Sequence, residues 1–263
     1  MNKLFIIKIG GNILDDPAQL KSFLHDFAAI REPKILVHGG GKIATELGNK
    51  LGIESKYVNG RRITDEQTID LVTMVYGGLV NRKLVASLQQ HHCNAFGITG
   101  ADGNMLKASK RPVKDIDYGY VGDITADSVN TSLLYFLLKQ NTVPVFAPLT
   151  YANGIMLNTN ADTIASVLAT ALSKHFDIRL IYCFEKKGVL MNVNDANSVI
   201  RHLTQKKYTE LLTQGILTDG ILPKLESAYA ALGTGVKEIL IGEAADLLKN
   251  IGQETEGTLL TLT

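Results

Sequence analysis

The sequence predicts an α/β protein with a central, mostly parallel β-sheet that is buried on both faces. Short β-rich runs alternate with helical segments along the 263 residues, which is typical of chains that pass from strand to strand through helices. These runs are almost continuously apolar, as in "KLFIIKI", "KILVH" and "IRLIYCF", and strands covered by helices on both faces have this composition. A hydrophobic fraction of 45% over this length is enough for a large core.

Six apolar runs are expected to be strands, with segments of 3.6-residue apolar period between them. The pairs Asn59-Gly60 and Asn153-Gly154 are flanked by strand-forming residues and predict hairpin turns. Because no repeat or long linker interrupts the chain, we expect one continuous sheet with a soft division near residue 175. The predicted strands are 3–9, 34–38, 94–99, 142–147, 178–184 and 236–242.

The balance of charges excludes several classes of partner. The chain carries 27 Lys and Arg residues against 26 Asp and Glu residues, so no basic field exists to hold a nucleic acid or an anionic membrane. The apolar runs "LFII" and "LLYFLL" are too short for a signal-peptide core or a bilayer span. Cys93 and Cys183 have no CxxC or metal-ligand spacing. We therefore expect a soluble, cytoplasmic protein that recognises a small molecule.

The first glycine-rich turn is "KIGGNIL", at the end of the first predicted strand. Ligands of open α/β sheets bind beyond the carboxyl ends of the strands, which is where Lys8, Gly10 and Gly11 would lie. Two residues without side chains let backbone N–H groups approach an anion. The alternative is a tight strand-to-helix turn in which the Lys8 side chain reaches solvent.

The second glycine-rich turn, "HGGGK", joins a strand to an amphipathic helix and is also a candidate anion site. Its spacing is not that of a Walker A loop, but Gly39, Gly41 and Ala44 match GxGxxA, which leaves a dinucleotide-binding alternative. That alternative needs a second strand ending in an acidic residue, whereas the chain continues into "SKYVNGRRITD". His38 is expected to be a hydrogen-bonded structural residue.

Polar side chains follow in "NGRRIT" and "NTNAD". Arg61 and Arg62 must point to opposite faces of a regular strand, so one can bind a carboxylate through two hydrogen bonds, unless both are solvated. Asn158 and Asn160 lie at alternate positions and share a face. Asp162 opens a helix, either as an acid favoured by the helix dipole or as a functional carboxylate.

The last stretch, "TDGILPK", begins a helix with Pro223 in its first turn. Lys224 then lies near the positive end of that helix, where a cation is disfavoured unless an anion binds beside it. Together, these stretches supply lysines, anion-binding turns, an arginine, amides and one acid, but no convincing nucleophile. Phosphoryl transfer suits this set, because it needs positive charge and positioning more than proton transfer.

The motifs "KIGGN", "VHGGG", "NGRRIT", "VGDI", "NTNAD" and "TDGILPK" occur in the order and at the spacing of the amino acid kinase family, which the chain resembles over nearly its whole length. The resemblance implies a three-layer αβα sandwich. It also implies a kinase of arginine biosynthesis that uses ATP and Mg²⁺ to convert the side-chain carboxylate of an N-acylated glutamate into an acyl phosphate. Residues 1–175 would form the acyl-amino-acid-binding lobe and residues 176–263 the nucleotide-binding lobe, with no metal held by protein ligands.

The resemblance also assigns residues. Lys8 and Lys224 would stabilise the transferring phosphoryl group, and Asp162 would hold both lysines in place. The chain departs from the family at "FEKKGVL", where a Ser/Thr-Asp pair is expected before a glycine, and at Asp219, where glycine is common. The substrate-binding residues implied are Gly40, Gly41, Arg62, Asn158 and Asn160; those implied for ATP are Gly10, Gly11, Glu185, Lys186, Lys187, Gly188, Val189, Leu190, Leu217 and Thr218.

The resemblance further implies a homodimer. Lys8 lies so close to the start of the sequence that we expect none of the extra N-terminal helix of arginine-inhibited hexamers, and hence no inhibition by arginine. Residues 63–92 have more apolar faces than one core needs and are the candidate dimer contact. Two alternatives remain: a sibling kinase for another carboxylate or a nucleoside monophosphate, and a noncatalytic arginine-sensing domain, which would be expected to lack the two lysines.

Overall fold

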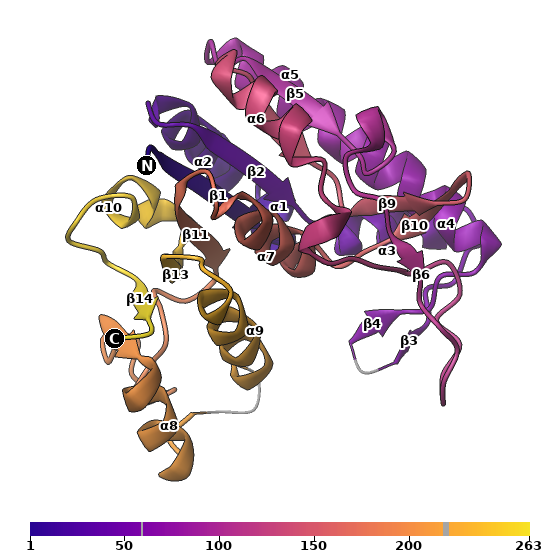
Figure 1. Cartoon of the computed structure of the whole chain (residues 1–263). Coiled ribbons are helices and arrows are strands. Elements are labelled where there is room, and N and C mark those ends of the chain that lie inside the picture. Colours follow the sequence, from indigo (N-terminus) through magenta and orange to yellow (C-terminus); the bar gives the residue numbers. More distant parts are fainter. Residues whose placement is uncertain (59, 218–220) are drawn as a thin grey trace.

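The computed structural model describes residues 1–58, 60–217 and 221–263. At its centre is an eight-stranded sheet in the order β12-β14-β13-β11-β1-β2-β8-β5, with helices on both faces (Figure 1). Strand β14 runs antiparallel to β13, and the other neighbouring strands are parallel. The predicted αβα sandwich around a mostly parallel sheet is confirmed. The predictions for Asn59, Thr218 and Asp219 lie outside the described residues.

The central strands match the six apolar runs of the sequence, and the two strands β12 and β14 at one side were not predicted. The strands of the central sheet are β1 (Lys3–Ile9), β2 (Lys34–His38), β5 (Ala95–Ile98), β8 (Val143–Phe146), β11 (Asp177–Phe184), β12 (His202–Thr204), β13 (Glu238–Glu243) and β14 (Thr258–Thr261). Three two-stranded ribbons add β3 (Tyr57–Val58), β4 (Arg61–Arg62), β6 (Ser109–Lys110), β7 (Gly122–Asp123), β9 (Leu149–Ala152) and β10 (Ile155–Asn158).

Helices connect the strands and cover the sheet. The α-helices are α1 (Gly11–Asp15), α2 (Pro17–Ala29), α3 (Gly41–Lys50), α4 (Glu66–Val72), α5 (Asn81–Gln90), α6 (Thr131–Lys139), α7 (Ala161–Leu172), α8 (Gln205–Thr213), α9 (Leu222–Gly233) and α10 (Leu247–Asn250). A π-helical segment, Thr73–Val80, joins α4 to α5. Short 3₁₀ turns cover Asp102–Asn104, Ala126–Ser128 and Ala244–Asp246.

Alternation along β1 divides the core into two layers. Leu4 and Ile6 pack with α7 and α9 on one face of the sheet, whereas Phe5, Ile7 and Ile9 pack with α1 to α5 on the other. This follows from the two-residue period of a strand, since successive side chains point to opposite faces. The position after Ile7 therefore faces α7.

Both predicted hairpins are present. Strands β9 and β10 are joined by Asn153 and Gly154, with φ of 49° and 80°, the left-handed conformations that Asn-Gly adopts readily. Strands β3 and β4 pair antiparallel, and Gly60 between them has φ of 72°. Because α3 is followed by this hairpin rather than by the next strand of a βαβ unit, the dinucleotide-binding alternative is not supported.

Segment 63–92, the candidate dimer contact, is helical from Glu66 to Gln90 and becomes π-helical in its middle. The π-helical turns of Thr73–Val80 bring Tyr76 beneath Gly40, where a Cβ atom would lie 3.0 Å from Tyr76 Cδ1. Such bulges often mark functional regions. Here the bulge supports the turn after β2.

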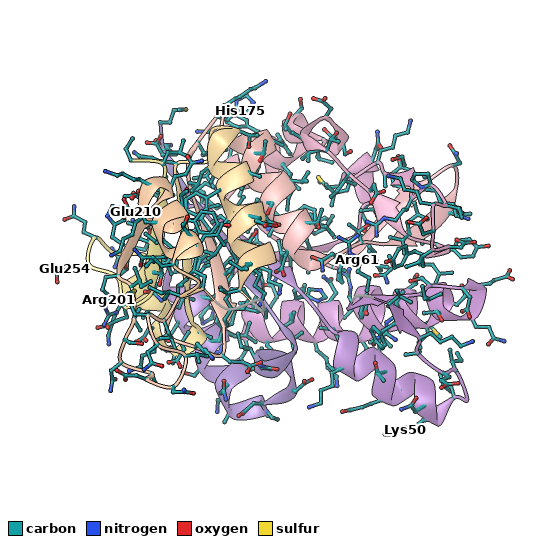
Figure 2. The ribbon with its side chains drawn as sticks, turned by 90° about the horizontal axis from the view of Figure 1, so that it is seen from below. Lys50, Arg61, His175, Arg201, Glu210 and Glu254 are labelled. Carbon is teal, nitrogen blue, oxygen red and sulfur yellow. The ribbon has the colours of Figure 1, made fainter. Side chains whose placement is uncertain are left out.

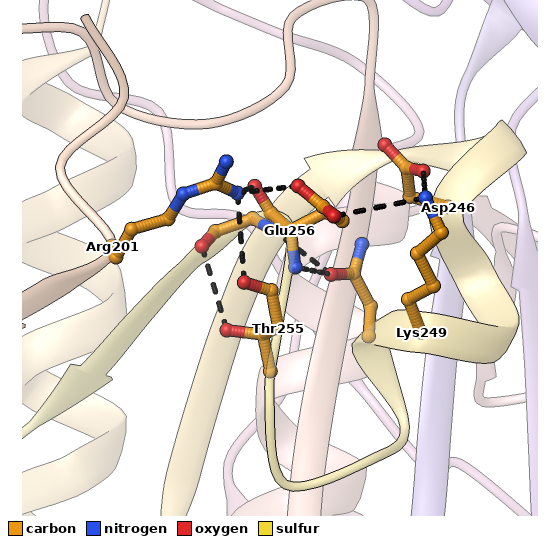
Figure 3. Close-up of polar contacts among 7 residues, drawn as sticks. Arg201, Asp246, Lys249, Thr255 and Glu256 are labelled. Atoms are coloured by element: carbon orange, nitrogen blue, oxygen red, sulfur yellow. Dashed lines mark hydrogen bonds and ion pairs between the residues drawn. The ribbon is translucent and has the colours of Figure 1, made fainter.

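A polar network anchors the chain before β14 (Figure 3). Asn250 Oδ1 accepts hydrogen bonds from the N–H groups of Glu256 and Gly257 at 3.0 and 2.9 Å. Glu256 also pairs with Arg201 at 2.9 Å and with Lys249 at 3.6 Å. These ion pairs are solvent-exposed and add little free energy of folding by themselves, so we ascribe the placement of β14 mainly to the buried amide of Asn250.

The two cysteines are buried and free. Burial raises the pKa of the Cys183 thiol to about 12, which leaves it unreactive near neutral pH. Within the described ranges, no helix is both long enough and apolar enough to cross a membrane.

Candidate active site

A cleft of about 740 Å³ opens at the carboxyl ends of β1 and β2, beside the N-termini of α7 and α9. Its walls come from segments far apart in the sequence, as expected for the ligand crevice of an open α/β sheet. Ten of the predicted residues line it: Lys8, Gly10, Gly11, Gly40, Gly41, Arg62, Asn158, Asn160, Asp162 and Lys224.

Lys8 and Asp162 form an ion pair at the base of this cleft. Lys8 continues the row of Leu4 and Ile6 on the face of β1 that packs against α7, and Asp162 lies in the first turn of α7. Lys8 Nζ is 2.8 Å from Asp162 Oδ1, and Lys8 is only 9% exposed. The β-strand period and the helix start together place the two charges in contact.

Lys224 approaches the same carboxylate from the first turn of α9. Loss of hydration in the cleft lowers the pKa of Lys224; Asp162 opposes this shift, whereas Lys8 adds to it. The Lys224 ammonium also lies 3.8 Å from the ring centroid of Phe184, at the end of β11. Two cations and one acid therefore share the centre of the cleft, which has excess positive charge for an anionic ligand.

The two glycine turns lie side by side. Gly39 N–H donates to Ile9 O at 3.0 Å, and a Cβ atom on Gly39 would lie 3.9 Å from Gly11 N. Gly40 has φ of 149°, which a residue with a side chain rarely adopts, and Tyr76 fills the space behind it. Both turns can therefore present backbone to the same ligand.

Arg62 lies at the opposite end of the cleft and is 7% exposed. Its guanidinium donates to Gly41 O at 2.8 Å, to Thr45 Oγ1 at 2.9 Å and to Ser55 Oγ. Arg61 is exposed and is also among the residues that line the cleft; its side chain is labelled in Figure 2. The buried Arg62 and the exposed Arg61 differ as alternation along a strand predicts, although both line the cleft.

The two asparagines have different surroundings. Asn158 lines the cleft, and its Nδ2 donates to Thr64 Oγ1 at 3.1 Å, while no described residue hydrogen-bonds to its Oδ1. Asn160 caps α7, because its Oδ1 accepts from Asp162 N–H at 2.8 Å and Thr163 N–H at 3.1 Å. Asn160 thus orients the acid that pairs with Lys8.

The predicted nucleotide residues after β11 do not line this cleft. A Cβ atom on Gly188 would lie 2.5 Å from Thr258 Oγ1, and Val189 N–H donates to the same oxygen at 2.8 Å, so this turn packs on β14. Leu217 is buried and Thr218 lies outside the described residues. The nucleotide-binding roles of Glu185, Lys186, Lys187, Gly188, Val189, Leu190, Leu217 and Thr218 stay predictions.

Sequence reasoning missed several residues of the cleft wall. Arg111 pairs with Asp123 at 2.5 Å, and Tyr182 OH lies 2.6 Å from Ser166 Oγ. Burial raises the pKa of Tyr182, which keeps its hydroxyl neutral. Tyr182 is the register partner of Lys8, and that pairing between β1 and β11 cannot be read from the sequence. The missed residues include Tyr57, Tyr76, Arg111, Ser166, Tyr182 and Phe184.

No group of three or more His, Cys, Asp or Glu side chains in the described parts of the chain could hold a metal ion. Among the lining residues that the structure describes, Asp162 is the one carboxylate, and Lys8 already pairs with it. A divalent ion would therefore have to enter with a ligand that supplies most of its oxygen donors, as phosphates do for Mg²⁺.

The chain is similar to known proteins over nearly its whole length. Residues 3–243 match the model of the amino acid kinase family. The chain is 52% identical over 263 residues to a protein of Cytophaga hutchinsonii named acetylglutamate kinase, covering 99% of each. It is 53% identical over 253 residues to the protein of that name from Parabacteroides distasonis, covering 96% of this chain and 98% of the relative.

Among solved structures, carbamate kinase from Giardia lamblia bound to AMP-PNP superposes with a TM-score of 0.72 at 12% identity, covering 100% of this chain and 99% of that one. This likeness concerns the fold alone. The family model and the near-full-length identities are decisive: the chain belongs to the amino acid kinase family.

Proposed function

We propose that this protein is an acetylglutamate kinase, which transfers the γ-phosphoryl group of ATP to the side-chain carboxylate of N-acetyl-L-glutamate or a close N-acyl-glutamate. The reaction yields an acyl phosphate and would be the second step of arginine biosynthesis. The relatives at 52% and 53% identity carry the name acetylglutamate kinase. The observation that carries the proposal is the Lys8–Asp162 pair at 2.8 Å beside two glycine turns.

This reaction requires positive charge and accurate positioning of the two substrates. A glutamate side chain has a reference pKa of about 4.3, so the acceptor is already an anion at neutral pH and needs no general base. The barrier lies in bringing two anions together. Lys8 and Lys224 would stabilise charge on the transferring group, and backbone N–H groups of Gly10 and Gly11 would hold ATP phosphates.

Asp162 would act on the lysines rather than on the substrate. Its carboxylate contacts Lys8 directly and faces Lys224, so it can hold both ammonium groups without neutralising them completely. His38 is not a candidate base, because burial lowers its pKa to about 4, and the reaction does not require one.

The acceptor would lie between the glycine turn after β2 and the hairpin β3–β4. Arg62 would bind the α-carboxylate, and Asn158, Asn160, Gly40 and Gly41 would contribute further contacts. Asn160 already caps α7, so its contribution would come mainly from the position of that helix.

Mg²⁺ fits this cleft only as an ion that arrives with ATP, because the described residues supply no cluster of metal ligands. When bound, it would neutralise phosphate charge. We assign no protein residue as its ligand.

The assembly is also a proposal. Residues 1–175 would bind the acceptor and residues 176–263 the nucleotide, on one continuous sheet. We expect a cytoplasmic homodimer that contacts through segment 63–92, with no nucleic acid or membrane as partner. Exposed Met74 and Leu79 on this segment are consistent with such a contact.

Trapping the product with hydroxylamine tests the proposal. Purified protein with Mg-ATP is assayed with N-acetylglutamate, N-succinylglutamate, N-acetyl-aminoadipate, free glutamate or no acceptor, and hydroxamate is measured. We expect hydroxamate with an N-acylated glutamate, and the strongest signal identifies the acyl group. ATP binding without hydroxamate from any acceptor would contradict the proposal and favour a sibling kinase or an arginine-sensing domain.

A further inference from the structure

His38 is a buried titratable residue for which the proposed mechanism has no role. It ends β2 directly before the three glycines and is 0% exposed. Its Nδ1 lies 2.7 Å from Gly39 O, and its Nε2 lies 3.1 Å from Asn81 Nδ2. Asn81, at the start of α5, is also fully buried and donates to Val145 O at 2.9 Å.

The partners of this ring fix its protonation. A carbonyl oxygen can only accept, so Nδ1 must carry the proton that is donated to Gly39 O. The Asn81 amide nitrogen can only donate, so Nε2 must be the unprotonated acceptor. The two partners therefore hold the ring as the Nδ1–H tautomer, and burial, which lowers the pKa of His38 to about 4, keeps it neutral.

This hydrogen bond also sets the orientation of the next peptide group. Gly39 C=O and Gly40 N–H belong to one peptide, which is trans like every other described peptide, and in a trans peptide these two groups point in opposite directions. Because Gly39 O points at the buried ring, Gly40 N–H points away from it, toward the side on which Gly39, Gly40 and Gly41 line the cleft. Gly40 N–H has no backbone acceptor among the described residues.

Glycine has no side chain to hold this peptide in place. At φ of 149°, Gly40 lies in a region where its backbone can rotate with little steric cost. The Gly39–Gly40 peptide could therefore turn over unless a partner holds its carbonyl. His38 provides that partner, and Asn81 holds the imidazole.

We propose that His38 and Asn81 are positioning residues that aim the Gly40 N–H at an oxygen of the reacting carboxylate and phosphoryl pair. The inference deepens the proposed function and rests on it for the identity of that oxygen. A preorganised N–H group aimed at developing negative charge accelerates a reaction without reorganisation. Removing the hydrogen bond from His38 to Gly39 O should therefore lower kcat more than it raises the KM for ATP.

Two substitutions by amide residues test the roles of the two ring nitrogens of His38 separately. In His38→Asn, the amide nitrogen takes approximately the place of Nδ1 and can still donate to Gly39 O. In His38→Gln, the amide oxygen can take approximately the place of Nε2 and accept from Asn81. No donor then remains near Gly39 O. Both variants place a neutral amide in the same buried site, which makes each the control for the other.

We expect His38→Asn to retain most of the wild-type kcat. The kcat of His38→Gln should fall by about tenfold or more, because the Gly40 N–H is then no longer oriented; misorienting an oxyanion donor costs less than deleting it. The KM for ATP should change less than kcat in both. Urea unfolding midpoints, measured for both variants, show whether a loss of rate follows a loss of stability. Equal kcat values in the two variants, or losses that track stability alone, would overturn the inference.

A second measurement does not depend on turnover. In ¹⁵N-labelled protein, the Gly40 amide resonance should move on titration with Mg-ATP in the wild type and in His38→Asn, and move much less in His38→Gln. If the wild type forms no acyl phosphate, the proposed function fails while this titration still decides the inference. The same Gly40 shift in His38→Gln as in His38→Asn would contradict it.

Discussion

Lys8 Nζ lies 2.8 Å from Asp162 Oδ1, and this contact joins the end of the central strand β1 to the first turn of α7. The contact holds the Lys8 ammonium at a defined position in the wall of the cleft. Preorganised charge of this kind needs little rearrangement during reaction.

Replacing Lys8 tests this contact. We expect Lys8→Ala to lower kcat by about 10²- to 10³-fold, the cost of losing one preorganised electrostatic contact in the transition state. Lys224→Ala should give a loss of the same order. The hydroxamate assay measures kcat, and ATP titration shows that the variants still bind nucleotide.

Lys42→Ala is the matched control, since Lys42 is exposed, pairs with Asp15 at 3.4 Å and does not line the cleft. It should leave kcat near the wild-type value. A wild-type kcat in both Lys8→Ala and Lys224→Ala would remove the mechanism.

Arg62→Lys should raise the KM for the acceptor with a smaller effect on kcat. The guanidinium of Arg62 is held as a planar fork by Gly41, Thr45 and Ser55, and an ammonium cannot reproduce its paired hydrogen bonds. Loss of a charge-assisted hydrogen bond is worth about 1.5–3 kcal/mol, or about a tenfold to hundredfold rise in KM. Arg61→Lys is the neighbouring comparison, and equal effects at both positions would contradict the assignment.

The pH dependence of kcat/KM for ATP should report Lys224. Its pKa is lowered from the ordinary value of 10.5, first by loss of hydration. The charged form is the active one, so activity should fall as the pH rises through this lowered pKa. In Lys224→Arg the guanidinium stays charged at higher pH, and the alkaline fall should shift upward; an unchanged profile would assign the titration to another group.

Asn160→Ala should destabilise the protein by about 1 kcal/mol, because the Asn160 side chain accepts two N–H groups at the start of α7. Asn160→Asp keeps the cap and should keep the stability. Urea unfolding measures both values. A stable Asn160→Ala variant with a raised acceptor KM would instead assign Asn160 to substrate contact alone.

The sequence predicted the central strands and the cleft residues because both depend on local patterns. Continuous apolar runs mark buried parallel strands, and glycine turns after them mark the ligand edge. The short strand β12 (His202–Thr204) was missed, since three residues with exposed His202 form no pattern. The packing of the turn at Gly188 on Thr258 was also missed, because that contact depends on tertiary structure; its nucleotide-binding role stays a prediction.

Phe184, at the end of β11, gives Lys224 an aromatic partner in the cleft. The Lys224 ammonium lies 3.8 Å from the Phe184 ring centroid, and the ring stacks with Tyr182 at 6.1 Å. A cation over an aromatic face gains about 0.5–2 kcal/mol. The ring therefore holds the flexible lysine near Asp162 without adding a charge that would compete for it.

Phe184→Leu keeps an apolar side chain but removes the aromatic face. We expect kcat to fall by about twofold to thirtyfold, the range that corresponds to 0.5–2 kcal/mol, with a smaller change in the KM for the acceptor. Phe184→Tyr retains the face and should retain the rate. If the leucine and tyrosine variants have equal kcat values at equal unfolding midpoints, the ring acts only through packing, and Lys224 must be held in place by Asp162 alone.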